Sequence, residues 1–437
     1  MSTAIAMGGA ASVETAALRK ITLRLSSFLF ALYLICFIDR TNAGIAALSM
    51  NQDLGLGATE FGLGAGLYFV GYWLFEVPSN LVLYRVGARI WLARIAITWG
   101  IVGMCLGLTQ GAHSFFALRF LLGVAEAGLY PGVVFYICLW YPAAFRAKPL
   151  AIFMSASVVA GIIMGPLSTW IMDATNGMFG FAGWRWMFAL EGLPAVILGV
   201  ATFFCLTDHP KDAAWLTADE KAWLLNSLDA DRRAQQPVEH RSVGRFLKDK
   251  RMWIMAGYYA SWTAGNVGIM FWLPTILKAS SSAANQSIGF LYGFFFVCAF
   301  VGMFAGAWFW RLTGDRRTTL LLCGVVPFVA MTISAFAASP VLAYVMLCIA
   351  AFFIWGMMPV FWTLPAEYWG GATAAAAIAF INSFTGLGGL IGPSLVGLIK
   401  DATGKFEWAV FALAVAFLFQ AGFTLALRIK KKVPAPA

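Results

Sequence analysis

Charged side chains are scarce in this 437-residue chain, at 11% of all residues against about 25% in a typical soluble domain. Hydrophobic residues make up 61% of the chain, and the mean hydropathy is +0.79. This composition excludes a soluble protein and indicates a polytopic helical membrane protein. The net charge of +10 does not indicate a nucleic-acid partner, because the basic residues lie in short segments between apolar spans, as membrane topology requires.

Histidine is also scarce, and the usual motifs of cofactor chemistry are missing. The three histidines, His113, His209 and His240, all fall in predicted loops. The seven cysteines show neither metal-ligand spacing nor a disulfide framework. The sequence has no phosphate-binding G-x-x-x-x-G-K-[ST] loop and no nucleophile elbow. We therefore expect no enzyme activity, no metal and no cofactor, and any buried proton carrier has to be a carboxylate.

Long apolar segments are plentiful, and twelve of them are long enough to cross a bilayer as helices. They cover residues 28–50, 60–83, 90–109, 114–139, 149–172, 186–206, 252–278, 286–310, 318–337, 341–364, 372–398 and 407–428. We predict an all-α polytopic membrane protein with twelve transmembrane helices, with the lipid bilayer as its surroundings and no further protein partner, as a monomer.

The basic residues predict the orientation of these spans. Of the 30 lysines and arginines, 24 fall in segments on one side of the membrane, four on the other, and two, Arg40 and Arg119, inside spans. Cytoplasmic segments are the ones enriched in Lys and Arg. Both termini are therefore predicted to be cytoplasmic, in a cell (inner) membrane protein.

The chain divides into two similar halves. Gly165-Pro166 precedes an Asp-Ala-Thr sequence in the fifth span, and Gly392-Pro393 precedes another in the eleventh, 227 residues later. We predict two six-helix pseudo-repeat bundles, residues 1–206 and 252–437, joined by a cytoplasmic linker at 207–251. Thr217 and Glu220 form a capping-box pattern that predicts a short helix in the linker. Such a parallel repeat is found in major facilitator transporters, whose substrate site lies between the halves.

The fourth span carries two charges in the stretch R-F-L-L-G-V-A-E-A-G-L-Y-P-G. On one continuous helix, Arg119, Gly123, Glu126 and Tyr130 would share a face. A charge at bilayer depth costs about 3 kcal/mol or more, so both charges require a partner or a wet cavity. Two interpretations stay open: a structural pair between Arg119 and Glu126, or an anion site beside a proton-carrying carboxylate.

The first and second spans add further polar residues, whereas the second half is neutral at the matching positions. Asp39 and Arg40 lie in F-I-D-R-T-N, and Tyr72 lies in the second span. At the internal offset, Asn266 stands where Asp39 does. The second half offers amides and aromatic rings, and we expect three of them to contact substrate: Asn266, Trp355 and Asn382.

Two arginines and two carboxylates can neutralise one another when the site is empty. An organic anion would compete for an arginine, whose planar fork matches a carboxylate. The carboxylate that loses its arginine would then be buried and unpaired, which favours binding of a proton. This competition predicts coupled movement of a small organic anion and a proton.

The sequence resembles the anion:cation symporter family of the major facilitator superfamily, and most closely its phthalate/tartrate-type organic-acid permeases. The resemblance covers nearly the whole chain and rests on F-I-D-R-T-N-A-G-I-A, E-V-P-S-N-L-x-L-x-R-V-G-A-R, R-F-L-L-G-x-x-E-A-G-x-Y-P-G and G-W-R-W-M-F-x-L-E-G. It implies the major facilitator fold and proton-coupled uptake of an organic acid. It also implies that Arg40, Arg119 and Tyr72 contact substrate, and that Asp39 and Glu126 carry protons.

Other functions of the same fold stay open. The chain has Phe37 where galactonate-type members have a tyrosine, which argues against a polyhydroxylated sugar acid and favours a less polar or aromatic one. We expect an aromatic or hydroxy mono- or dicarboxylate as the substrate. A hexuronate- or galactonate-like symporter remains an alternative. So do an exporter or antiporter of the same fold, which the paired arginines argue against, and a membrane sensor that binds substrate without transporting it.

Overall fold

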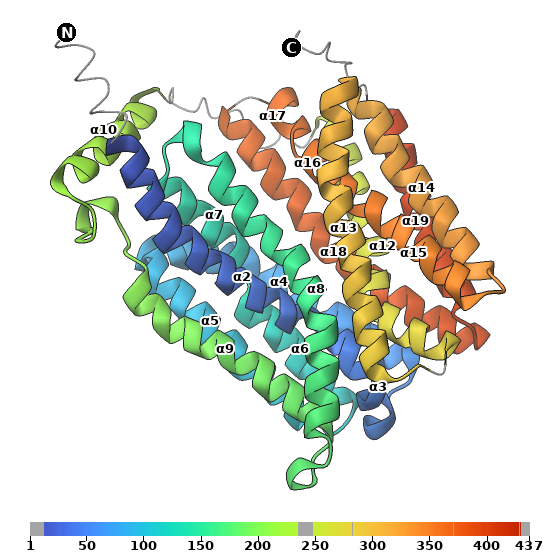
Figure 1. Cartoon of the computed structure of the whole chain (residues 1–437). Helices are drawn as coiled ribbons and strands as arrows, with labels where there is room; N and C mark the ends of the chain where they lie inside the picture. Colours follow the sequence, from blue (N-terminus) through green and yellow to red (C-terminus); the bar gives the residue numbers. More distant parts are fainter. Residues whose placement is uncertain (1–12, 235–247, 282, 370, 428, 430–437) are drawn as a thin grey trace.

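The computed structural model describes residues 13–234, 248–281, 283–369, 371–427 and 429, and every regular element in them is helical (Figure 1). A lipid-exposed chain has to satisfy its backbone hydrogen bonds within each segment, as a helix does. Ten helical segments are long and apolar enough to cross a membrane. Two more long helices, α4 (Ala58–Val86) and α12 (Lys250–Ser280), line the cavity described below. The twelve predicted spans are therefore all helical.

The first six spans correspond to eight helices, because two of the spans are broken. After a π-helical turn at Thr22–Ser26, they are α2 (Ser27–Thr41), α3 (Ala43–Leu54), α4, α5 (Ala88–Cys105), α6 (Ala112–Glu126), α7 (Leu129–Trp140), α8 (Ala147–Thr175) and α9 (Gly183–Cys205).

The second six spans are α12, α13 (Asn285–Thr313), α14 (Arg316–Phe336), α15 (Pro340–Gly356), α18 (Gly371–Thr403) and α19 (Glu407–Ala426), with the short helices α16 (Met358–Phe361) and α17 (Leu364–Tyr368) after α15. The seventh span begins at Lys250, inside the segment predicted as linker.

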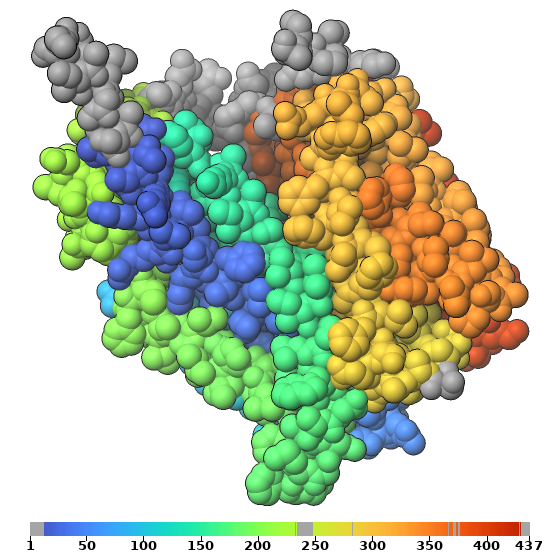
Figure 2. Space-filling model, in the orientation of Figure 1, coloured from blue at the N-terminus to red at the C-terminus, as the bar shows by residue number. Residues whose placement is uncertain are grey.

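The helices pack as two groups that meet along a seam. In the first group α4 packs on α6, α5 on α9 and α2 on α8; in the second α14 packs on α19, α13 on α15 and α12 on α19. In the described part of the chain, the main contacts between the groups are those of α4 with α18, α8 with α13, and α3 with α12. Figure 2 shows α8, in green, against α13, in yellow and orange, along this seam.

The two groups are joined tightly at one end of the molecule, the end that carries α3 in Figure 1. There the Asp401 carboxylate of α18 accepts hydrogen bonds from the backbone N–H groups of Ala58 and Thr59, at 3.3 and 2.7 Å. A Cβ on Gly165 of α8 would clash with the carbonyl oxygen of Gly289 of α13, so only glycine allows this approach. All hydrogen bonds between the groups that are found among the described residues lie at this end, which we call the closed end.

The linker helix α10 (Ala218–Ala234) lies at the opposite end and binds the first group (Figure 1). The predicted capping box is confirmed: the Glu220 carboxylate accepts from the Thr217 N–H at 2.9 Å, and the Thr217 hydroxyl accepts from the Glu220 N–H at 3.3 Å. Glu220 also pairs with Lys20 at 2.8 Å, and the Asp231 carboxylate accepts from the Ala143 N–H at 2.6 Å. The helix of the linker is therefore attached to the first group.

One prediction about the fourth span is wrong. Arg119, Gly123 and Glu126 do lie on one helix, α6, but the chain breaks at Ala127–Gly128 before Tyr130. Pro131 cannot continue a helix through this point, because its ring clashes with the carbonyl four residues earlier. Gly128 adopts φ 90°, a conformation that glycine takes at little cost. Tyr130 therefore belongs to α7 and is oriented independently of Arg119.

Candidate functional site

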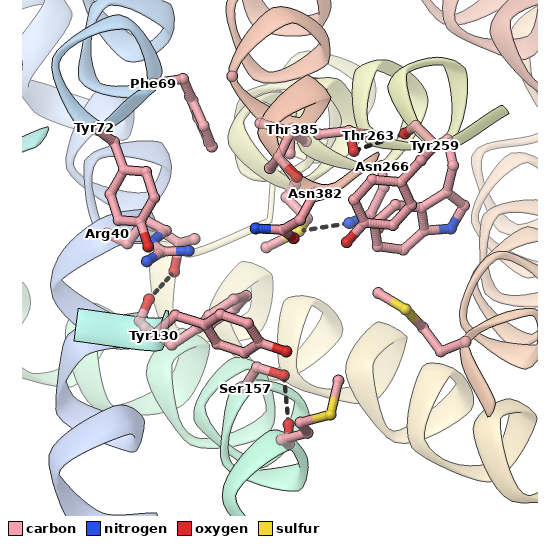
Figure 3. Close-up of a pocket in the computed structure, with 18 of the residues that line it drawn as sticks. Arg40, Phe69, Tyr72, Tyr130, Ser157, Tyr259, Thr263, Asn266, Asn382 and Thr385 are labelled. Carbon is pink, nitrogen blue, oxygen red and sulfur yellow. Dashed lines mark hydrogen bonds between the residues drawn. The ribbon is translucent and has the colours of Figure 1, made fainter. Parts of the chain in front are cut away.

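A cavity lies between the two groups of helices, beyond the closed end. Aromatic and polar side chains dominate its lining (Figure 3). From the first group come Tyr33, Phe37, Arg40, Tyr68, Tyr72, Glu76 and Tyr130, and from the second Tyr259, Trp262, Asn266, Trp355, Trp362 and Asn382. Of the predicted substrate-contacting residues, the cavity thus brings together Arg40, Tyr72, Asn266, Trp355 and Asn382.

Arg40 links the cavity to a buried carboxylate. Its guanidinium forms an ion pair with Glu126 and donates from Nε to Glu126 Oε1 at 3.0 Å. The same oxygen accepts from the Tyr68 hydroxyl at 2.6 Å and from the Cys36 thiol at 3.1 Å. Glu126 is fully buried, whereas the Arg40 side chain keeps 15% exposure. An ion pair with one accessible member can be opened by a ligand that competes for that member.

The second oxygen of this carboxylate is free. Glu126 Oε2 is buried and has no hydrogen-bond partner among the described residues. A buried acceptor without a donor costs about 1–3 kcal/mol, and a proton bound there would remove the negative charge from the pair. The carboxyl group therefore has an open position for a proton while its other oxygen is held by Arg40 and Tyr68.

Arg40 is surrounded by aromatic rings. Its Cζ atom lies 5.4 Å from the centroid of Tyr72, 5.5 Å from that of Tyr68 and 5.9 Å from that of Phe37. Cations are attracted to the faces of such rings, more strongly where water is excluded. The rings thus surround the guanidinium at the cavity wall, and Tyr72 lies beside it.

Arg119 occupies a different environment from the one predicted. It is fully buried, does not line the cavity, and makes no ion pair with Glu126, which pairs with Arg40 instead. Its guanidinium donates to the carbonyl oxygens of Arg40 and Ala65, each at 3.4 Å. The Arg40 carbonyl is accessible because α2 ends at Thr41 and the helix restarts at Ala43. The Arg119 guanidinium thus contacts the backbone of Arg40.

Asp39 faces away from the cavity, although it precedes Arg40 directly. Adjacent helical residues point about 100° apart, so only one of the two can face the seam. Asp39 is 2% exposed and accepts a hydrogen bond from Trp99 Nε1 of α5 at 2.8 Å. The predicted substrate and proton residues of F-I-D-R-T-N therefore lie in two different environments, one at the cavity wall and one inside the first group.

A second buried carboxylate near Asp39 was missed by the sequence analysis. Glu191 of α9 accepts from the Ser168 hydroxyl at 2.5 Å and from Asn42 Nδ2 at 2.9 Å. It lies in G-W-R-W-M-F-x-L-E-G, inside the sixth apolar span, so the rule that identified Glu126 identifies it as well. Its partner Asn42 is the residue at the break between α2 and α3, and Glu191 therefore fixes the turn that follows Arg40.

The second group supplies neutral polar atoms, several of them without partners. Asn266 Oδ1 and Trp355 Nε1 are buried and have no hydrogen-bond partner in the described part of the chain. Figure 3 shows Asn266 and Asn382 across the cavity from Arg40 and Tyr72. Tyr259 stacks on Trp262, with ring centroids 5.4 Å apart, and meets Trp362 edge-on at 4.9 Å. Unpaired polar atoms beside an aromatic wall are groups that a ligand can satisfy.

The described residues contain no group of three or more His, Cys, Asp or Glu side chains able to hold a metal ion. The charged groups at the cavity are instead an arginine with its carboxylate partner and Glu76. This arrangement can bind an anion and exchange a proton.

Comparison with known proteins identifies the family. The profile of the Major Facilitator Superfamily matches residues 29–393, so the chain belongs to this superfamily of membrane transporters. It is 43% identical over 415 residues to a putative tartrate transporter of Agrobacterium vitis, covering 95% of each chain. It is 40% identical over 406 residues to a quinolone resistance transporter of Acinetobacter baumannii, covering 93% of each chain.

Solved structures agree with this fold. A bacterial homolog of the human lysosomal transporter Spinster, in an inward-facing and occupied conformation, superimposes with a TM-score of 0.77 at 16% sequence identity. The match covers 92% of this chain and 96% of the other. The major facilitator fold expected from the sequence motifs is confirmed, and the protein is a multi-span membrane transporter.

Proposed function

We propose that this protein takes up a small organic acid anion together with protons, by alternating access of one central site to the two sides of the membrane. The observation that carries the proposal is that Arg40 faces the cavity while its partner Glu126 is fully buried. A carboxylate that enters the cavity meets the guanidinium first. The likeness at 43% identity to the relative named a putative tartrate transporter supports an organic acid as the cargo.

The proposed coupling follows from competition for one arginine. When the substrate carboxylate binds Arg40, Glu126 loses its ion-pair partner in a buried place. Desolvation favours the neutral carboxyl there, and Oε2 has no partner among the described residues to prevent protonation. Substrate and proton therefore load together, and release of one favours release of the other.

The remaining residues have supporting roles in this proposal. Tyr72, Asn266, Trp355 and Asn382 contact the body of the substrate, and Arg119 acts on the same site through the Arg40 backbone. Asp39 is a second carboxylate whose protonation would affect the bond with Trp99.

We further propose that residues 1–206 and 252–437 rock as two bodies around the cavity, linked by 207–251. The protein would act as a monomer in the cell inner membrane, with both termini and α10 in the cytoplasm. The excess of Lys and Arg on that side supports this orientation. The closed end then faces away from the cytoplasm, and the cavity is accessible from the inside.

A second candidate is export of an aromatic drug by the same fold. It is favoured by the likeness to a quinolone resistance transporter and by the aromatic wall of the cavity. The direction of transport under an imposed proton gradient separates the two candidates. Accumulation of an organic acid inside acid-outside vesicles supports uptake, and extrusion under the same gradient supports export.

The test of coupling is Glu126→Gln in proteoliposomes. Glutamine resembles the protonated carboxyl and cannot release a proton. We expect this variant to exchange substrate across the membrane at a rate within about threefold of the wild type, while accumulation driven by a pH gradient is lost. Substrate concentrated against its gradient by Glu126→Gln would assign the coupling proton to another group, with Asp39→Asn as the next variant to measure.

A further inference from the structure

The cavity carries a second charged group that the coupling mechanism does not use. Among the described residues that line it, only Arg40 and Glu76 carry a formal charge. Glu76 lies on α4 one turn beyond Tyr72, on the side away from the closed end. The two charges thus mark different parts of the same cavity, one cationic and one anionic.

The Glu76 carboxylate is available to a ligand. It is half-buried, and the described residues offer it neither a hydrogen bond nor an ion pair. Its backbone carbonyl accepts from Asn80 Nδ2 at 2.7 Å, which holds this turn of α4 in place. The guanidinium of Arg40 is engaged by Glu126. Glu76 is therefore a positioned carboxyl group without a counterion among the described residues.

The surroundings of Glu76 suit a cation. Tyr72 and Trp73 precede Glu76 by about one turn on α4, and both line the cavity together with Tyr130. A carboxylate among aromatic faces attracts a positively charged or hydrogen-bond-donating group by charge and by cation–π attraction. It repels a second carboxylate by the same charge.

The cavity that holds both charges is lined largely by rings. Twelve of the 27 lining residues are aromatic, and Tyr259 and Trp262 stack nearly parallel, at an interplanar angle of 14°. Flat apolar faces favour a flat ligand, since offset and edge-on contacts between rings add to the burial of apolar area. The Asn266 Oδ1 and Trp355 Nε1 atoms, unpartnered within the described residues, can bind polar substituents on its edge.

From these observations we infer that the cavity selects an aromatic acid with one carboxylate, at Arg40, and a basic nitrogen or other donor group at the far end, at Glu76. Glu76 is the residue that discriminates against dicarboxylates. This inference rests on the proposed function, because it assigns the substrate carboxylate to Arg40, and it adds the chemical class that the same site prefers.

The test uses three probes that share one ring: benzoate, para-aminomethylbenzoate and terephthalate, with tartrate as an aliphatic reference. Binding to the purified full-length protein is measured at neutral pH by titration and by the shift in melting temperature. For the wild type we expect the zwitterionic probe to bind at least tenfold more tightly than terephthalate, with benzoate between them.

Glu76→Gln should change the affinities for the zwitterionic probe and for terephthalate in opposite directions. We expect it to weaken the zwitterionic probe about tenfold, to strengthen terephthalate about tenfold, and to leave benzoate within about threefold. Glu76→Asp keeps the charge and serves as the matched control, which should retain the wild-type order. Equal changes for all three probes in Glu76→Gln, or a wild type that prefers terephthalate, would overturn the inference.

The outcome for the proposed function is read separately, from Arg40→Lys. This variant should weaken every acid in the panel, because lysine keeps the charge and loses the planar fork. Arg40-dependent binding of tartrate without binding of the aromatic probes would leave the proposed function standing and overturn the selectivity. If the wild type bound none of these acids, both would fail.

Discussion

At the cavity, the first bundle carries an ion pair, whereas the second presents neutral polar groups with atoms left free. Glu126 is held by Arg40 and Tyr68, and Asp39 by Trp99. Asn266 and Trp355, in contrast, each keep a buried polar atom without a partner in the described residues. At the cavity the first bundle therefore holds the paired charges, and the second supplies neutral polar atoms that a ligand can bind.

This difference is relevant to the coupled transport proposed above. An ion pair that lies within one bundle stays with that bundle as it moves. The free-energy cost of desolvating its charges therefore does not recur with each movement. Neutral amide groups and aromatic rings can bind a ligand without the free-energy cost of desolvating a charge of their own. A substrate that binds both bundles contacts Arg40 in the first and neutral groups such as Asn266 in the second at the same time. It therefore favours a conformation in which the two bundles are close.

The largest effect is expected in the first bundle, from Arg40→Ala. It removes the anion-binding fork and leaves Glu126 buried without a counterion, a situation that costs about 3–5 kcal/mol. Transport should fall by more than about a hundredfold and the melting temperature should drop. The double variant Arg40→Ala/Glu126→Gln removes the unpaired charge, so its melting temperature should recover while transport stays lost. Transport by the double variant would contradict the role of Arg40.

A smaller effect is expected in the second bundle, where Asn266→Leu replaces an amide by an apolar group of similar size. Loss of one hydrogen bond to the substrate costs about 1–1.5 kcal/mol, so the KM should rise about tenfold. The number of protons moved per substrate should stay unchanged, because Glu126 and Arg40 are intact. Parallel uptake and pH measurements on the same vesicles check both values. A changed ratio would show that coupling is shared by both bundles.

The smallest effect is expected where the bundles meet, at Asp401. Asp401→Asn keeps a hydrogen-bond acceptor for the N–H groups of Ala58 and Thr59 and removes the charge that faces the start of α4. A charge at a helix N-terminus contributes about 0.3–1 kcal/mol, so the closed end should open up to about fivefold more often. Spin labels at Gln52 and Thr403, one in each bundle, should then show a larger long-distance population. An unchanged distance distribution would assign the closed end to packing alone.

Several features of the fold could be predicted from local sequence. The apolar lengths predicted the helices, and the cap at Thr217 and Glu220 predicted the start of α10, because both depend on residues a few positions apart. The break in the fourth span also had a local signal in Gly128 and Pro131, which the helical periodicity around it obscured.

The site could be predicted in part. The rule that charges inside a bilayer are functional identified Arg40, Arg119, Asp39 and Glu126 from their positions in apolar spans. It could not assign partners, because Arg119 and Glu126 lie two turns apart on one helix while Arg40 reaches Glu126 from another. Tyr68 and Cys36 carry no charge and gave no signal, although both donate to the same carboxylate oxygen.

By itself, then, the sequence determined that this chain crosses a membrane, that it is built from helices, and which few residues bring charge into the bilayer. These depend on composition and on spacing along one helix. Only the tertiary structure decided that Arg40 rather than Arg119 pairs with Glu126, that Asp39 faces Trp99, and that Glu76 has no counterion among the described residues. The physical reason is that spacing determines the face of a helix, while the partner on that face depends on where the axes of the neighbouring helices lie.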